Sequence, residues 1–178
     1  MPERLKIHET SKIAGRTILF DANVFLYVFW PTGKTRNEAD YSRLYKKCLQ
    51  QKIPIAMDFT VLSEVINRAI RIEHSKYLNE NGLSAQAVPF KKYRDSQDGI
   101  QAQNDIYEIV KMSLRTILVC GKEFSKEDVL SFMTVDSLDF NDKGIVSLCS
   151  QKGYVLATND HDFSGQNIAI ISANQNIA

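Results

Sequence analysis

Four short apolar runs decide which folds this sequence can adopt. They are TILF (residues 17–20), IPIAM (53–57), YVLAT (154–158) and IAIIS (168–172). Apolar and polar residues do not alternate along them, so each run is predicted to be a strand that is buried on both faces, as in a parallel sheet. Helical stretches separate the runs, and helices that connect parallel strands cover the sheet. We therefore expect an α/β fold with a covered, mainly parallel sheet.

The intervals between these runs place apolar residues at helical spacing. We expect helices over 37–50, from an N-cap at Thr60, over about 100–118, from a capping box at Ser125, and from the region of Asp142 to a C-cap at Gly153. Residues 79–99, with two glycines and a proline as turn signals among them, are predicted to form a loop excursion. At 178 residues with 44% apolar content, the chain is expected to be a single domain (1–178) with an N-terminal extension (1–16).

Composition excludes several classes of protein. The three cysteines are far apart and fit neither a disulfide framework nor a zinc finger, and the three histidines include no pair four residues apart. No apolar run approaches the ~18 residues that span a membrane, and the polar N-terminus lacks the apolar centre of a secretory signal. We expect a cytoplasmic protein with no membrane association. A net charge of +1 means that phosphate binding would need local basic patches or a bound cation.

Acidic residues stand at the ends of predicted strands and the starts of predicted helices. Asp21 ends the first strand, Asp160 and Asp162 follow the YVLAT strand, and Glu64 and Asp142 lie in first helical turns. Ligands of parallel sheets bind beyond the carboxyl ends of the strands, so these carboxylates are expected to cluster there. For Glu64 and Asp142 a purely structural alternative stays open, because an acid in a first turn complements the helix dipole.

A cluster of carboxylates requires a counter-charge. Two carboxylates about 4 Å apart repel by roughly 1 kcal/mol in water and ~4 kcal/mol at the dielectric of a protein surface. A divalent cation offsets this repulsion, and oxygen ligands select hard ions, so Mg²⁺ or Mn²⁺ is expected rather than zinc. Such an ion lowers the pKa of bound water and stabilises the leaving oxygen of a phosphodiester. The acids therefore predict metal-assisted hydrolysis.

These residues also carry a resemblance to the PIN-domain family. ILFDANVFLY (18–27) resembles the first motif of the family, an apolar strand followed by Asp-x-Asn. TVLSEVINR (60–68) is similar to the second, and NDKGIVSLCSQKGYVLATNDHDF (141–163) to the third and fourth together. The resemblance implies a three-layer α/β/α sandwich with a central, mainly parallel sheet and the activity of a metal-dependent endoribonuclease.

The resemblance also assigns roles to residues. It implies catalytic and metal-binding roles for Asp21, Glu64, Asp142 and Asp160, with Asp162 as a fifth metal ligand, and substrate-orienting roles for Asn23 and Thr158. A local turn hydrogen bond is the structural alternative for Asn23. Asp139 and Asp136 lie just upstream of Asp142; we take Asp142 as the third acid, because the apolar helix follows it, and Asp139 as the reserve.

Small bacterial members of the family include VapC-like toxins, which pair with an antitoxin, and the family implies a homodimer. This chain departs from the minimal toxins by the residues before its first predicted strand and by the long interval between Glu64 and Asp142. These additions leave the choice between a toxin and an RNA-processing role open.

Basic residues offer candidates for RNA contacts. KKYR (Lys91, Lys92, Tyr93 and Arg94) combines cations with an aromatic ring that could stack on a base, and Arg68 and Arg71 follow Glu64 on the same helix. Solvated surface charges are the alternative.

Two further hypotheses for the whole chain stay open: a non-catalytic RNA-binding or scaffold protein of the same fold, and a haloacid-dehalogenase-type phosphatase. The phosphatase reaction needs a second Asp two residues after the first, where this chain has Asn23.

Overall fold

A computed structural model describes residues 2–33 and 35–177. Within this part of the chain, six strands form one sheet in the order β1-β6-β5-β2-β3-β4, and all neighbouring strands are parallel. The strands are β1 (Arg4–Lys6), β2 (Ile18–Phe20), β3 (Ile55–Asp58), β4 (Ile117–Cys120), β5 (Val155–Ala157) and β6 (Ile170–Ser172). The α/β class and the parallel sheet are thus confirmed.

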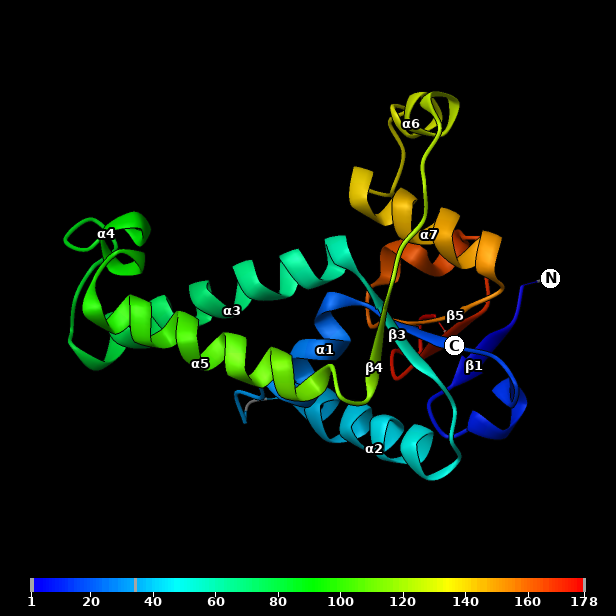
Figure 1. Ribbon diagram of the computed structural model, residues 1–178, viewed down its shortest axis with the longest axis horizontal. Helices are drawn as coiled ribbons and strands as arrows, with labels where there is room; N and C mark the ends of the chain where they lie inside the picture. The colour runs from blue at the N-terminus through cyan, green and yellow to red at the C-terminus, as the bar shows by residue number, and fades with distance from the viewer. Residues whose placement is uncertain (1, 34, 178) are drawn as a thin grey trace.

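Helices connect the strands and cover the sheet. They are α1 (Ala22–Phe29), α2 (Arg36–Gln50), α3 (Phe59–Glu80), α4 (Phe90–Arg94), α5 (Gln97–Ser113), α6 (Lys126–Phe132) and α7 (Phe140–Lys152), with 3-10 turns η1 (Thr10–Ile13) and η2 (His161–Gly165). Figure 1 shows α1 and α2 on one side of the sheet and α7 on the other, so the chain forms the expected three layers. No helix in the described ranges is long and apolar enough to cross a membrane.

The core follows directly from the apolar runs. All three residues of β2, of β5 and of β6 are buried, and helices pack on them with residues such as Tyr41, Leu44, Ile145 and Leu148. Because short parallel strands have side chains covered on both faces, they need continuous apolar sequence. β4 is at the edge of the sheet, and there Leu118 and Val119 are exposed.

Two expectations at element starts are wrong. The predicted N-terminal extension contains β1, a strand that pairs with β6. The helix expected to begin after an N-cap at Thr60 begins at Phe59, because the Asp58 carboxylate accepts hydrogen bonds from the Thr60 backbone N–H and hydroxyl (2.8 and 2.6 Å). Glu64 therefore lies in the second turn of α3 rather than in its first.

The region between residues 79 and 120 also differs from its prediction. The expected loop excursion (79–99) contains α4 and the first residues of α5, and the helix expected over about 100–118 ends at Ser113. Ile117, expected on that helix, belongs to β4, whose β-branched and apolar residues fit a strand equally well. In Figure 1, α3 and α5 run side by side away from the sheet, with α4 at the outer end of this hairpin.

Candidate active site

The carboxyl edge of the sheet forms a row of polar residues. In the register of the strands, Phe20 pairs with Ala157, Ala157 with Ile171, and Lys6 with Ser172. The residues that follow β2 and β5, Asp21 and Thr158, therefore stand level with Ser172 and Lys6. Neighbouring strands are about 4.8 Å apart, so this row places one functional group from each strand side by side.

Asp21 is the buried centre of the row, with 6% of its surface exposed. It is the N-cap of α1, and its Oδ1 accepts a hydrogen bond from the Ala22 backbone N–H (2.6 Å). Its Oδ2 accepts from the Asn23 amide (2.5 Å) and from the Thr158 hydroxyl (2.7 Å). A buried carboxylate is costly unless donors surround it, and here three donors fix its position.

Thr158 and Asn23 connect this carboxylate to the loop after β5. The Thr158 Oγ1 accepts from the Asp160 backbone N–H (3.0 Å), and the Asn23 Oδ1 accepts from the Asn159 backbone N–H (3.2 Å). Asp160 in turn caps η2 by accepting from the Asp162 backbone N–H (3.1 Å). Asn23 and Thr158 thus both contact Asp21, and Asn23 combines a local hydrogen bond to Asp21 with one to the loop after β5.

Two carboxylates of the site, Asp21 and Asp142, have a raised pKa. Burial raises the pKa of Asp21 to about 6, with further increases from the charges of Glu64 and Asp160, although the bonds from Thr158 and Ala22 oppose the rise. Burial also raises the pKa of Asp142 to about 7, helped by the charges of Asp139, Asp21 and Asp160. The acids from four chain segments therefore lie within electrostatic reach of each other.

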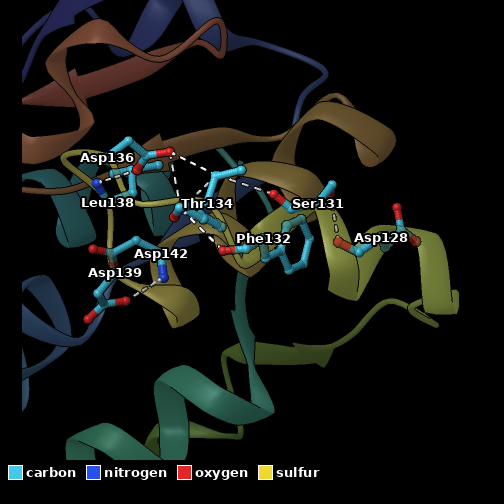
Figure 2. A network of polar contacts seen from close by, with 9 residues as sticks. Asp128, Ser131, Phe132, Thr134, Asp136, Leu138, Asp139 and Asp142 are labelled. Atoms are coloured by element: carbon cyan, nitrogen blue, oxygen red, sulfur yellow. Dashed lines mark hydrogen bonds and ion pairs between the residues drawn. The ribbon is translucent and has the colours of Figure 1, made fainter.

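Asp139 and Asp142 divide two roles at the start of α7. Asp139 is exposed and is the N-cap, with its Oδ1 accepting from the Asp142 backbone N–H (2.8 Å), as Figure 2 shows. Asp142 is half-buried, and its side chain is the one that interacts with Asp21 and Asp160. The geometry therefore favours Asp142 as the third acid, with Asp139 as the residue that caps its helix.

A buried lysine braces the segment before α7. The Lys143 Nζ donates to the Phe132 carbonyl (3.2 Å) and to the Thr134 carbonyl and hydroxyl, and it pairs with Asp136 (3.1 Å). Asp136 in turn accepts from the Leu138 backbone N–H (2.9 Å), as Figure 2 shows. Asp136 is thereby committed to holding the α6–α7 connection.

Glu64 reaches the site from α3. It is half-buried, and its Oε1 pairs with Arg68 Nη1 (3.1 Å) four residues along the helix. Its negative charge raises the pKa of Asp21, so the two carboxylates face one region. Arg68 therefore lies beside the acids as expected, but bound to one of them.

The remaining RNA-contact candidates lie elsewhere. Arg71 lies over the Phe90 ring, 4.3 Å from its centroid, and Lys91, Lys92 and Arg94 are exposed on α4 at the outer end of the hairpin. Figure 1 places α4 far from the sheet edge. Tyr93 is only 3% exposed, so its predicted stacking on a base is wrong.

Tyr93 is used in the core of the hairpin instead. Its ring stacks on His74, with centroids 5.0 Å apart and planes 24° apart, and also contacts Tyr77. The sequence placed Tyr93 among three cations, which suggested a surface position. Only the packing of α4 against α3 shows that the ring points inward.

Two residues of the edge were missed in the sequence. Asp58 follows the apolar residues of β3 in the way that Asp21 follows β2, and the register Leu19–Ala56 places the two acids level on adjacent strands. Tyr41, buried on α2, donates its hydroxyl to the Thr158 carbonyl (2.7 Å) and accepts from the Ala173 backbone N–H (3.2 Å). The acid after an apolar run could have identified Asp58, whereas nothing local distinguishes Tyr41 from a core residue.

The donor chemistry of this edge fits a hard divalent cation. All candidate ligands are carboxylate oxygens, and a divalent cation bound between them would offset their mutual repulsion. As the side chains stand, no group of three or more His, Cys, Asp or Glu residues in the described ranges could hold a metal ion. Protein donors occupy several of them instead, Arg68 on Glu64 and the Asp162 N–H on Asp160.

Comparison with known proteins gives a structural likeness. No family model matches the chain, and no curated protein matches it. Among solved structures, the chain resembles a chain in the crystal structure of VapBC2 from Rickettsia felis bound to a DNA fragment from their promoter. The TM-score is 0.50 and the identity 16%, over 88% of this chain and 98% of that chain. At this identity the likeness shows a shared fold.

Proposed function

We propose that this chain is a ribonuclease that hydrolyses RNA phosphodiesters with Mg²⁺ or Mn²⁺ held by Asp21, Glu64, Asp142 and Asp160, with Asp162 at the rim. The observation that carries the proposal is the gathering of carboxylates from separate chain segments at one edge of the sheet, where burial and neighbouring charges raise the pKa of Asp21 and Asp142. Strongly perturbed acids in such a position are typical of functional sites.

The chain's own residues divide the work. Thr158 and Asn23 fix the Asp21 carboxylate from the side of Oδ2, which leaves a lone pair of Oδ1 beside its one bond from the Ala22 N–H. Glu64 binds Arg68 through Oε1, so its second carboxylate oxygen can serve the cation while the neighbouring guanidinium is placed to bind a phosphate. The cation, when bound, supplies an activated water and stabilises the leaving oxygen.

The likeness to a VapBC2 chain supports a toxin paired with an antitoxin as the biological setting. The neighbour is part of a complex bound to a DNA fragment of its promoter. For this chain we propose an antitoxin partner and, as the family resemblance implies, a homodimer. Exposed apolar residues around α6 and the start of α7, such as Leu130, Met133 and Phe140, give a partner protein apolar surface to cover.

The phosphatase alternative loses support at one residue. Asn23 occupies the position that a second catalytic Asp would need, and its amide donates to Asp21 while its oxygen accepts from Asn159. A carboxamide is neither an acid nor a base near neutral pH, so Asn23 cannot transfer a proton to a leaving group.

A cleavage assay with matched variants tests the proposal. We expect the wild type to cut an unstructured RNA in Mn²⁺ and to stop in EDTA. Asp21→Asn and Asp142→Asn should each lower the rate by more than about 100-fold, because each removes a charge that the cation needs. Asp105→Asn, which changes an exposed carboxylate on α5, is the control and should cut at the wild-type rate.

Calorimetry with Mn²⁺ shows whether a variant that cuts slowly has lost metal affinity or only catalytic activity. The two site variants should bind Mn²⁺ more weakly than the wild type and the control. A wild type that binds no Mn²⁺ and cuts no RNA would establish the non-catalytic alternative, and hydrolysis of p-nitrophenyl phosphate would establish a phosphatase.

A further inference from the structure

A basic cleft opens at the end of the sheet beside the carboxylates. Its volume is about 640 Å³, and it lies between the carboxyl ends of β1 and β6 and one side of α2, from Arg36 to Lys47. Cationic side chains line it, together with one acid and the end of β6: Lys6, Arg36, Arg43, Lys47, Asp40 and Ser172. Four cations against one carboxylate give this cleft a formal charge of +3, whereas the whole chain carries +1.

The cleft is a constructed feature rather than a chance gathering of lysines. Asp40 is 8% exposed and pairs with both Arg36 (3.6 Å) and Arg43, whose side chains remain largely exposed. The buried carboxylate thus attracts two exposed guanidiniums to the rim of the cleft. No ion pair of Lys6 or Lys47 is found in the described ranges, so their ammonium groups are available to a ligand.

The cleft and the acids belong to one continuous edge. Lys6 is level with Ser172, Ser172 with Thr158, and Thr158 with Asp21, through the pairing of β1, β6, β5 and β2. At about 4.8 Å between strands, Lys6 lies roughly 15 Å along the edge from Asp21. Tyr41, next to Asp40 on α2, donates to the Thr158 carbonyl (2.7 Å), so the same side chain supports both the cleft and the site.

We propose that this cleft binds the backbone phosphates of the RNA strand on one side of the scissile bond. This inference rests on the proposed function, because the RNA in the cleft is taken to be the same strand that is cut at the acids. A single strand lying along the edge would meet negative charge only at the acids, where a cation compensates it, and positive charge beyond them. Arginines held in place suit phosphate oxygens, and lysines contribute point charges.

The position also explains how a chain of small net charge binds a polyanion. Non-specific binding of nucleic acid depends on the number of phosphates neutralised, and each contact to a single strand contributes about 0.7 to the slope of log K against log salt. The three formal charges concentrated here suffice for a short track without a basic surface overall. The cations of α4, at the outer end of the hairpin, are not required.

Binding measured without metal tests the cleft separately from the chemistry. Fluorescence anisotropy with a labelled 20-nucleotide unstructured RNA in EDTA compares the wild type with Lys6→Gln/Lys47→Gln. These lysines do not pair with Asp40, so the double variant leaves that buried carboxylate satisfied. We expect about tenfold weaker binding and a salt slope that is smaller by about 1.4, and about 0.7 for Lys47→Gln alone.

The charge-matched control is Lys91→Gln/Lys92→Gln on α4, which removes the same charge from the hairpin. It should bind RNA as the wild type does. If the control weakens binding as much as the cleft variant does, or the cleft variant binds like the wild type with an unchanged urea midpoint, the cleft proposal is overturned.

Cleavage in Mn²⁺ separates the two proposals. The cleft variant should cut a trinucleotide at the wild-type rate and the 20-nucleotide RNA at least several-fold more slowly at low concentration. A wild type that binds RNA through the cleft but cuts nothing would overturn the ribonuclease and leave the cleft. If the wild type cuts RNA and the cleft variant cuts both substrates at the wild-type rate, the cleft proposal is overturned and the ribonuclease proposal stands.

Discussion

The hydroxyl of Thr158 is the single group on which most of the site depends. It donates to Asp21, accepts from the Asp160 backbone N–H, and lies 3.4 Å from the Asn23 amide. Because it is fully buried, water cannot replace it when it is lost. A residue of this kind acts through Asp21, by holding the carboxylate where its charge is useful.

Replacing this hydroxyl predicts a separable effect. Thr158→Val keeps the shape but leaves the Asp160 N–H without its acceptor and removes one of the two donors to Asp21 Oδ2. We therefore expect a loss of about 1–3 kcal/mol in the free energy of unfolding. Mn²⁺ affinity should fall about 10- to 100-fold. Thr158→Ser retains the hydroxyl and should restore the Mn²⁺ affinity, with only the loss of a buried methyl in stability. Urea denaturation and calorimetry give the two numbers; equal Mn²⁺ affinity in all three proteins would leave Thr158 a purely structural role.

At the scale of elements, the α3–α5 hairpin depends on a close approach at Gly99. This glycine is buried near the start of α5, and a Cβ built on it would lie 2.0 Å from the Tyr93 carbonyl oxygen and 2.8 Å from the Arg94 Cα. Both are backbone atoms, so a side chain cannot be accommodated by a rotamer change. The glycine therefore lets the end of α4 lie directly against the start of α5.

Gly99→Ala should separate the hairpin from the site. We expect overpacking to cost about 1–3 kcal/mol in the free energy of unfolding, while Mn²⁺ affinity stays at the wild-type value because α4 is remote from the acids. The matched control is Gly144→Ala on α7, where the nearest atom would be the Phe124 ring at an ordinary 3.6 Å. That change should stabilise by up to ~1 kcal/mol, as alanine does in helices. A stable Gly99→Ala protein would show that α4 can move.

The acid cluster makes the stability of the whole molecule depend on pH. Raised pKa values of about 6 for Asp21 and about 7 for Asp142 mean that the folded chain binds more protons than the unfolded chain between about pH 4 and pH 7. The free energy of unfolding therefore falls as pH rises through this window. For the buried Asp21, the shift from 3.8 corresponds to a cost on the order of 3 kcal/mol above pH 7.

Urea denaturation in EDTA at pH 5.0 and pH 7.5 measures this dependence. We expect the wild type to be less stable at pH 7.5, and Asp142→Asn to show a smaller difference. Mn²⁺ should remove most of the loss at pH 7.5, since it compensates the ionised acids. Exposed acids with a lowered pKa, such as Asp128 and Asp136, take up protons only below this pH window and do not affect the comparison. A chain that is more stable at pH 7.5 than at pH 5.0 in EDTA contradicts the electrostatic account.

Local sequence was enough to predict four of the strands of the parallel sheet (β2, β3, β5 and β6), the helices α2, α6 and α7, and most of the acids at the edge of the sheet. The reason is that these signals depend on residues close by in the chain. Ser125 forms its capping box with Asp128, and Gly153 ends α7 by donating its N–H to the Cys149 carbonyl. The fold then follows, because parallel strands bring their carboxyl ends together wherever the acids stand in the sequence.

Long-range packing decided the rest. β1 exists only because β6 offers it an edge, Ile117 is in a strand because Ile55 pairs with it, and Tyr93 is buried because α4 folds onto α3. The carboxylates could be identified in the sequence, but the cleft beside them could not. Lys6 and Lys47 are 41 positions apart and line the same cleft only because β1 and α2 lie next to each other in the fold. A residue's neighbours along the chain set its local conformation, whereas its charge environment depends on strand order and helix packing.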